Sequence, residues 1–120
     1  MGEHAVARVE DVPEGGRLIT TVEGRSIAIV RHRGRYYALR NRCAHQGGPA
    51  CEGAILPTLR AVVNERGRTD EFFDADRMVV CCPWHGWEYE LETGVLVADR
   101  TRRIATYDVR VENGDVYVKV

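Results

Sequence analysis

Apolar residues in this chain recur mostly with the two-residue period of β-strands. β-branched and aromatic residues fill these runs, and glycine-containing pairs separate them. No stretch has a convincing helical period, so the pattern predicts an all-β fold. Weak alternation at residues 4–10 is typical of an edge strand. Three hairpins are expected in the flanking regions: residues 17–22 with 26–32 across Glu23-Gly24, residues 26–32 with 36–40 across Arg33-Gly34, and residues 104–112 with 115–120 across Asn113-Gly114.

The middle of the chain is patterned less regularly. Residues 64–69 look like a hairpin tip between the apolar run at 59–63 and Glu-Phe-Phe at 71–73. Met78 to Val80 predict a further strand, and Trp-Glu-Tyr-Glu-Leu at 87–91 alternates as another. A last short strand is expected at residues 95–97.

Composition restricts the class of protein. The 120 residues suffice for one domain with one core, and the formal net charge of −1 gives no bias towards nucleic acid or lipid. No apolar run is long enough to span a bilayer, and the N-terminus has no apolar signal core. We therefore expect a cytoplasmic protein with no nucleic-acid or membrane partner. Four cysteines in such a chain favour metal binding over disulfides.

Two short motifs carry the chemistry. Cys-Ala-His begins at Cys43 and ends at His45, and Cys-Pro-Trp-His-Gly begins at Cys82 and contains His85. Each motif places one thiolate and one imidazole within a tight turn. This donor set suits an iron–sulfur cluster or zinc, and it does not suit magnesium or calcium. No nucleophile–base group or phosphate-binding glycine loop is present, so no catalytic residues are expected.

At these residues the chain resembles the Rieske family, above all the Rieske ferredoxins and the Rieske domains of oxygenases. The block Cys-Pro-Trp-His-Gly-Trp-Glu-Tyr-Glu-Leu, followed by Thr93-Gly94, is the most specific part. The resemblance implies one Rieske-type [2Fe-2S] cluster per chain, with two cysteines on one iron and two histidines on the other. The implied metal and cofactor ligands are Cys43, His45, Cys82 and His85.

The resemblance also implies the architecture. One domain over residues 1–120 would contain an antiparallel β-sandwich or barrel base, formed by about 1–40 and 98–120. A small cluster-binding subdomain would occupy about 41–97. The spacer between the motifs is longer than in typical ferredoxins of this kind, so we expect an insertion at about 57–75. Two interpretations of the insertion remain open, a partner contact and a passive surface extension.

Several residues beside the ligands are expected to surround the cluster. Respiratory members of the family carry a disulfide where this chain has Gly48 and Trp84, so that bridge is absent. A tyrosine hydroxyl is present at Tyr89, but the serine of the high-potential members is replaced by Trp87. We therefore expect a potential in the low part of the Rieske range. The expected surrounding residues are Gly47, Gly48, Pro83, Trp84, Gly86 and Tyr89.

Two cysteines and a group of arginines lie outside the ligand set. Cys51 and Cys81 are interpreted as small half-buried residues, with a bridge between them as the less favoured alternative. Cys81 is expected to point away from the cluster, because side chains alternate along a strand. A basic stretch is either the solvated face of a hairpin or a docking patch for an acidic redox partner; it contains Arg31, Arg33, Arg35, Arg40 and Arg42. Three further arginines are expected near the cluster end: Arg100, Arg102 and Arg103.

Three functional hypotheses follow. The first is a one-electron carrier that accepts electrons from a flavin-dependent reductase and passes them to a terminal oxygenase or other oxidoreductase. The second is a small subunit of a larger oxidoreductase, similar to the small subunit of nitrite reductase. The third is a zinc-binding structural domain that uses the same four residues. On the first two hypotheses the chain is an electron-transfer component and is not expected to catalyse a reaction alone.

Overall fold

The computed structural model describes residues 2–44, 47–84 and 86–120, with only the backbone described at residue 60. Within this part of the chain, two antiparallel sheets and a single 3-10 turn make up the regular structure, so the predicted all-β class is confirmed. The elements are β1 (Glu3–Arg8), η1 (Val9–Asp11), β2 (Arg17–Val22), β3 (Arg25–His32), β4 (Arg35–Arg40), β5 (Ile55–Val63), β6 (Thr69–Cys81), β7 (Glu88–Glu90), β8 (Thr106–Glu112) and β9 (Asp115–Lys119).

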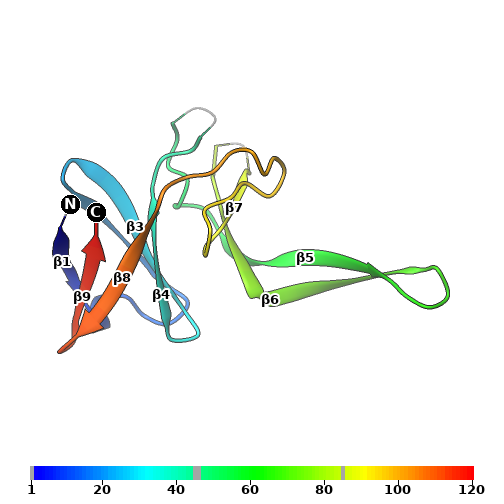
Figure 1. The fold of residues 1–120 in the computed structure, drawn as a ribbon, viewed down its shortest axis with the longest axis horizontal. Helices are drawn as coiled ribbons and strands as arrows, with labels where there is room; N and C mark the ends of the chain where they lie inside the picture. Colours follow the sequence, from blue (N-terminus) through cyan, green and yellow to red (C-terminus); the bar gives the residue numbers. More distant parts are fainter. Residues whose placement is uncertain (1, 45–46, 85) are drawn as a thin grey trace.

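The first sheet forms a base from both ends of the chain. Its strand order is β1-β9-β8-β4-β3-β2, and β1 also approaches β2, so the sheet nearly closes into a barrel (Figure 1). The three predicted hairpin turns are confirmed. At each turn both central residues have positive φ: Glu23 and Gly24 at 50° and 77°, Arg33 and Gly34 at 52° and 75°, Asn113 and Gly114 at 51° and 78°. This is the geometry of the tight turns that match the twist of antiparallel strands.

Strand β3 has both faces buried, which explains its uninterrupted apolar run. Ile27 and Ile29 point into the core of the base, together with Val116 and Val118 of β9. Ala28 and Val30 alternate to the opposite face and join a second core. That second core also contains residues of the two motif loops and of the second sheet. The base therefore supplies one wall of the region where the motifs lie.

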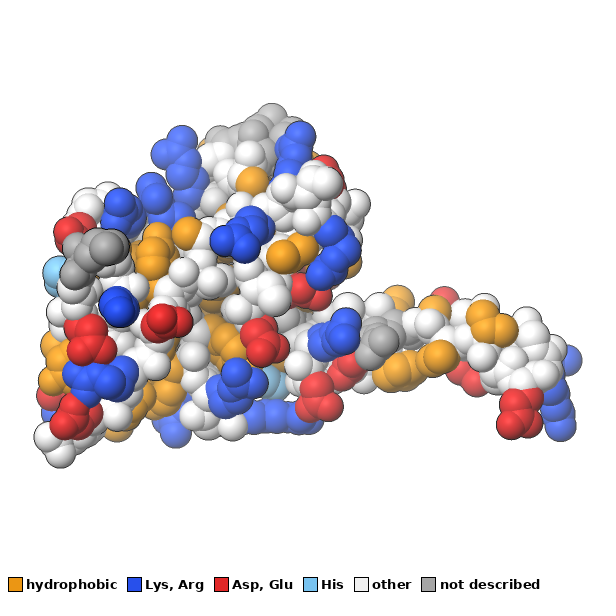
Figure 2. Space-filling model, viewed as in Figure 1, with side chains coloured by type: hydrophobic (Ala, Val, Ile, Leu, Met, Phe, Trp, Pro, Cys, Tyr) orange, Lys and Arg blue, Asp and Glu red, His pale blue; other side chains and the backbone are white. Residues whose placement is uncertain are grey.

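The second sheet has the order β5-β6-β7, and its largest part is a projecting hairpin. We call the segment from Thr58 to Asp76 the arm. The arm extends away from the rest of the molecule (Figure 1). With the arm included, the longest dimension of the molecule is 52 Å and the shortest 22 Å. The tip is a turn over residues 64–68, as predicted. Apolar side chains are exposed along the arm (Figure 2): Leu59, Val62, Val63, Phe72 and Phe73.

The structure corrects two details of the predicted elements. The edge strand ends at Arg8, and residues 9–11 turn as η1. Residues 95–97 do not form a strand; Val95 and Leu96 make only isolated bridges, to Arg103 and Tyr89. The backbone hydrogen bonds of this segment are divided between β7 on one side and Arg102 on the other, so neither side forms a continuous ladder. Over the described residues, the structure contains no helix of the length and apolarity that a membrane crossing requires.

Candidate metal centre

The two motif loops have the same backbone hydrogen-bond frame. The first follows β4, and the second joins β6 to β7. In the first, the Cys43 N–H donates to the Gly48 carbonyl at 2.7 Å, and the Gly47 N–H donates back to the Cys43 carbonyl at 2.9 Å. In the second, the corresponding bonds join Cys82 to Trp87 at 2.7 Å and Gly86 to Cys82 at 2.8 Å. The N–H of each cysteine thus donates to the carbonyl five residues later, and the carbonyl of each cysteine accepts the N–H four residues later.

A glycine with positive φ closes each frame. Gly47 has a φ of 72° and Gly86 a φ of 70°, a region that other residues adopt only with strain. The glycines at these positions were expected near the cluster, and their conformation gives the physical reason for the residue type. The loops also present their cysteines alike, although the histidine follows two residues after Cys43 and three after Cys82.

The two motif cysteines come together in one core. Cys43 is 3% exposed and Cys82 is fully buried, and both pack in the cluster of side chains that contains Tyr89. The Tyr89 oxygen lies 3.1 Å from the Cys43 Sγ and accepts the Ala44 N–H at 3.0 Å. The hydroxyl proton takes no part in that bond, so the hydroxyl can donate it to the sulfur when Cys43 is a thiolate. The Tyr89 hydroxyl thus lies where it can donate to a Cys43 thiolate, and its role beside a cluster remains a prediction.

The electrostatics of Tyr89 agree with a donor role. Burial raises the pKa of the phenol above its ordinary value because it disfavours the phenolate, and the contact with Cys43 raises it further. The hydroxyl therefore keeps its proton throughout the neutral range. A buried hydroxyl held in this way donates to the sulfur without competition from bulk water.

Trp84 and Gly48 join the two loops. Gly48 is buried, and a Cβ built there would lie 2.6 Å from the Trp84 Cδ2, so the indole ring covers the glycine directly. Trp84 as a whole is nevertheless 56% exposed. Respiratory members of the family that the chain resembles carry a disulfide at these two positions. A ring-on-glycine contact takes its place here. Pro83, between Cys82 and Trp84, is exposed.

Asn41 is a structural residue of the first loop that the sequence analysis did not identify. Its side chain is buried, accepts the Cys51 N–H at 2.9 Å and donates to Glu52 Oε2 at 2.8 Å. These bonds connect the start of the first loop to the segment after it. The available signal was a polar side chain at the strand end, two residues before Cys43.

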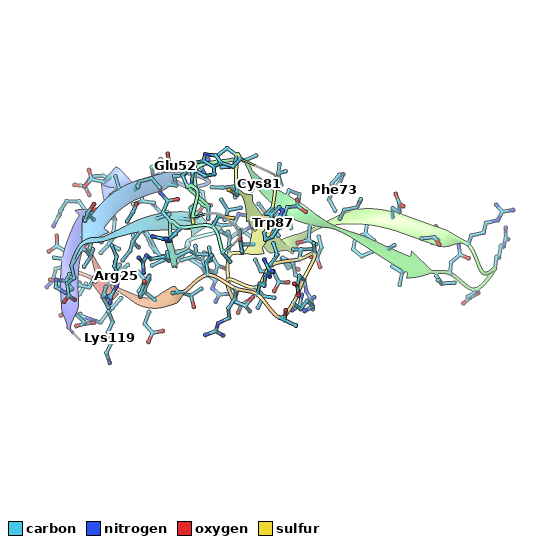
Figure 3. The ribbon with its side chains drawn as sticks, turned by 90° about the horizontal axis from the view of Figure 1, so that it is seen from above. Arg25, Glu52, Phe73, Cys81, Trp87 and Lys119 are labelled. Atoms are coloured by element: carbon cyan, nitrogen blue, oxygen red, sulfur yellow. The ribbon has the colours of Figure 1, made fainter. Side chains whose placement is uncertain are left out.

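Cys51 and Cys81 are free thiols, so the alternative of a bridge between them is not realised. Cys51 is fully buried, more than expected, and burial raises the pKa of its thiol to about 12. Cys81, labelled in Figure 3, is half-buried, with its Sγ 3.8 Å from Glu88 Oε2. Its neighbour Cys82 is buried in the core. Burial and then Glu88 raise the pKa of the Cys81 thiol as well. Neither thiol is prone to ionise near neutral pH.

The remaining predicted ligands, His45 and His85, lie outside the described residues. Within the part described, no group of three metal-ligating side chains comes together. The centre as described therefore consists of two buried thiols on matched loops, a hydroxyl donor and a tryptophan cover. Pairing of these two cysteines with two histidines remains a prediction.

Comparison with known proteins identifies relatives along most of the chain. Residues 2–108 match the family described as the Rieske [2Fe-2S] domain. A human Rieske domain-containing protein is 34% identical over 74% of this chain and 46% of its own length. The 3-phenylpropionate/cinnamic acid dioxygenase ferredoxin subunit of Escherichia coli is 31% identical over 92% of this chain and 86% of its own. The chain thus spans about half of the human relative and most of the bacterial one.

One solved structure is close in fold. The ferredoxin of carbazole 1,9a-dioxygenase from Nocardioides aromaticivorans superposes with a TM-score of 0.74, covering 98% of this chain and 97% of that one. The sequence identity is 21%, so this likeness concerns the fold. It includes the barrel-like base and the second sheet in one arrangement.

Proposed function

Since this chain belongs to the Rieske [2Fe-2S] domain family, we propose that it is a one-electron carrier, which takes electrons from a flavin-dependent reductase and delivers them to a terminal oxygenase. The observation that carries the proposal is the pair of buried motif cysteines, one of which lies within hydrogen-bond distance of the Tyr89 hydroxyl. The 31% identity to a dioxygenase ferredoxin subunit supports the kind of partner. We place the carrier in the cytoplasm.

The donor set fits a Rieske-type cluster. Cys43 and Cys82 would hold one iron, and His45 and His85 the other. When bound, the cluster accepts and returns one electron. The chain's own residues exclude water from both sulfurs, because Cys43 and Cys82 are buried in a shared core. A thiolate in such a site is held in place by the matched loop frames and needs little rearrangement on a change of charge.

The hydroxyl of Tyr89 sets the potential in part. A hydrogen bond donated to the Cys43 sulfur stabilises the more negative, reduced state of the cluster and so raises its reduction potential. The serine hydroxyl of high-potential members has no counterpart, because Trp87 occupies that position. With one such donor, we expect a value in the low part of the family's range of about −150 to +300 mV.

The proposal is tested on protein purified without oxygen. Iron and sulfide are assayed, and the dithionite-reduced sample is examined by EPR. We expect about two irons and two sulfides per chain and a rhombic signal with the low average g value of a mixed cysteine and histidine cluster. An all-cysteine type of spectrum would overturn the ligand set. A zinc-loaded protein that takes up no iron on reconstitution would favour the structural zinc hypothesis.

A second candidate function rests on the arm. Apolar side chains on a projecting two-stranded ribbon are costly to expose, and Val63 and Phe73 are each 70% exposed. This favours a subunit that buries the arm against a larger oxidoreductase. Co-purification of a stable partner that is lost when Phe73 is replaced by serine would support it. A protein that remains alone in its native host extract would exclude it.

A further inference from the structure

The arginines of the basic stretch divide into two groups. Three of them, at the turn between β3 and β4, lie near carboxylates: Arg31 is 3.9 Å from Glu14, Arg35 is 3.8 Å from Glu92, and Arg33 pairs with Asp76. Their charges are compensated locally. This end of β4 also lies away from the first motif loop, which follows the other end of the strand. These three arginines therefore fit the solvated-hairpin interpretation.

The other two arginines gain a third from a distant part of the chain. The Arg40 N–H donates to the Ala105 carbonyl at 2.8 Å, which brings the segment before β8 against the end of β4. Arg40, Arg42 and Arg103 consequently line one open pocket of about 540 Å³ with Cys43, Ala44 and Gly47 of the first motif loop. No aspartate or glutamate lines this pocket, and among the described residues none pairs with these three arginines.

This group lies directly on the first motif loop. A Cβ at Gly47 would be 3.4 Å from the Arg42 Nη2, so the guanidinium extends over the glycine that closes the loop. Arg42 and Arg103 are exposed, and Arg40 is half-buried. Figure 2 shows several basic side chains gathered at this end of the molecule. Neighbouring Arg100 and Arg102 are instead held by Glu90 at 3.5 Å and Asp99 at 3.4 Å.

We propose that Arg40, Arg42 and Arg103 form a docking face for a carboxylate-rich surface of the redox partner. The inference rests on the proposed function and deepens it, because it gives the sign of charge that the partner carries. Three uncompensated guanidinium groups in an open, shallow pocket fit several carboxylates on a protein surface, each free to accept a two-point hydrogen bond. The three arginines make this face positive, whereas the formal net charge of the chain is −1. The charge of the face and the net charge therefore predict opposite salt dependences for the reaction with a charged partner.

The test uses the reduced holoprotein and two small oxidants of opposite charge. One electron passes from the reduced cluster to ferricyanide, giving ferrocyanide, or to tris(phenanthroline)cobalt(III), giving the cobalt(II) complex. Stopped-flow rates are measured from about 10 mM to about 200 mM salt. We expect the ferricyanide rate constant to fall by about fivefold as salt rises, and the cobalt rate constant to increase. Salt dependences of the reverse signs would overturn the docking face.

Charge-matched variants locate the effect. Arg42→Gln and Arg103→Gln should each reduce the ferricyanide rate at low salt by about two- to threefold. Arg35→Gln changes the net charge equally, but Arg35 lies at the opposite end of β4 from Arg40 and beside Glu92, so its rate should remain that of the parent. An equal fall in all three variants would show an effect of net charge alone and would overturn the proposal. EPR of each variant establishes that the cluster is intact.

A second measurement distinguishes a docking face for a protein surface from a binding site for a small anion. Polyglutamate should slow the ferricyanide reaction in the parent and not in the double variant Arg42→Gln, Arg103→Gln. Protection by inorganic phosphate at an equal concentration of charge would indicate a small-anion site and would overturn docking. A protein that forms no cluster and shows no redox reaction would refute the proposed function itself, which distinguishes that failure from a failure of the docking face.

Discussion

The two motif loops share a backbone and differ in what surrounds it. Both fix a cysteine by the same pair of hydrogen bonds and close with a left-handed glycine. The first loop has the Tyr89 hydroxyl on its sulfur and Arg42 over its glycine, whereas the second contributes the Trp84 ring that covers Gly48. The difference teaches that the backbone frame sets the position of the sulfurs. Side chains from elsewhere in the chain set the reduction potential, the shielding of the loops from solvent and the charge of the surface above them. Substitutions can separate these two layers.

The largest effect is expected from the cysteines themselves. Cys43→Ser and Cys82→Ser should each abolish the EPR signal and reduce iron to under about a tenth of the parent, because a serine oxygen is a poor ligand for this cluster. Cys51→Ser is the matched control, since Cys51 is also fully buried in the same core. It should keep the cluster, at a modest cost in stability. Loss of the cluster in Cys51→Ser alone would show that the ligand set is wrong.

Glycines at close contacts come next. Gly53→Ala should destabilise by about 3 kcal/mol, because its Cβ would overlap the Cys81 carbonyl oxygen, which is held in β6. Gly48→Ala should cost less, about 1–2 kcal/mol, because the Trp84 ring that it meets is half exposed and can move. The measurement is chemical denaturation of the holoprotein together with the rate of cluster loss.

A double substitution sharpens this comparison of the loops. If the ring-on-glycine contact joins them, Gly48→Ala combined with Trp84→Ala should cost less than the sum of the two single changes. Strict additivity would show that the loops hold their positions independently. The backbone frames alone would then be sufficient to hold the two loops in position.

The left-handed glycines test whether the frames are equivalent. Gly47→Ala and Gly86→Ala should each cost about 1–2 kcal/mol, since φ values of 72° and 70° impose the same strain on alanine. Gly47→Ala has in addition the Arg42 guanidinium at 3.4 Å, a long side chain that can give way. Thermal unfolding of both variants measures the difference. Costs that differ by more than about 1 kcal/mol would contradict equivalent frames.

Removal of one hydroxyl should alter the potential and leave the fold. Tyr89→Phe should lower the reduction potential by about 40–90 mV, which corresponds to about 1–2 kcal/mol for one electron. Tyr37→Phe removes a hydroxyl from a ring packed against the same core and should leave the potential unchanged. EPR-monitored redox titration gives both values. An unshifted potential in Tyr89→Phe would mean that the hydroxyl does not donate to the Cys43 sulfur.

The sequence predicted most of the local structure because its signals are local. The turns at Glu23-Gly24 and Asn113-Gly114 follow from residues that tolerate positive φ, and the strands follow from alternation. Both motif cysteines and Tyr89 were predicted beside one another from a resemblance that is confirmed at the level of the family. The described cysteines occupy one core, and the histidine ligands remain predictions.

Other features could not be predicted, because they depend on pairing between distant segments. The division of the basic stretch depends on which arginines meet carboxylates from Glu14, Asp76 and Glu92, and on the approach of Arg103 to Arg40. The Glu90 side chain, although it alternates with buried Tyr89 and Leu91, is only 15% exposed, and Arg100 lies 3.5 Å from its carboxylate. The pairing along the arm, with Thr58 to Val63 registered against Asp74 to Thr69, is by contrast local, and the sequence indicated its tip.

The smallest effect on the cluster is expected from shortening the arm. Residues 58–77 can be replaced by Asn-Gly, which joins Pro57 to Met78, a pair that already faces across the hairpin. The change removes the contact of His32 Nε2 with the Ala75 carbonyl and the Arg33–Asp76 pair, both at the surface of the base. It leaves the pairing of Val79 and Val80 with β7, which holds the second loop. The EPR signal and potential should therefore equal those of the parent, with a melting temperature changed by about 4 °C or less. Loss of the cluster would show that the arm supports the loops, and the distinction between backbone frame and surrounding side chains would then have to include it.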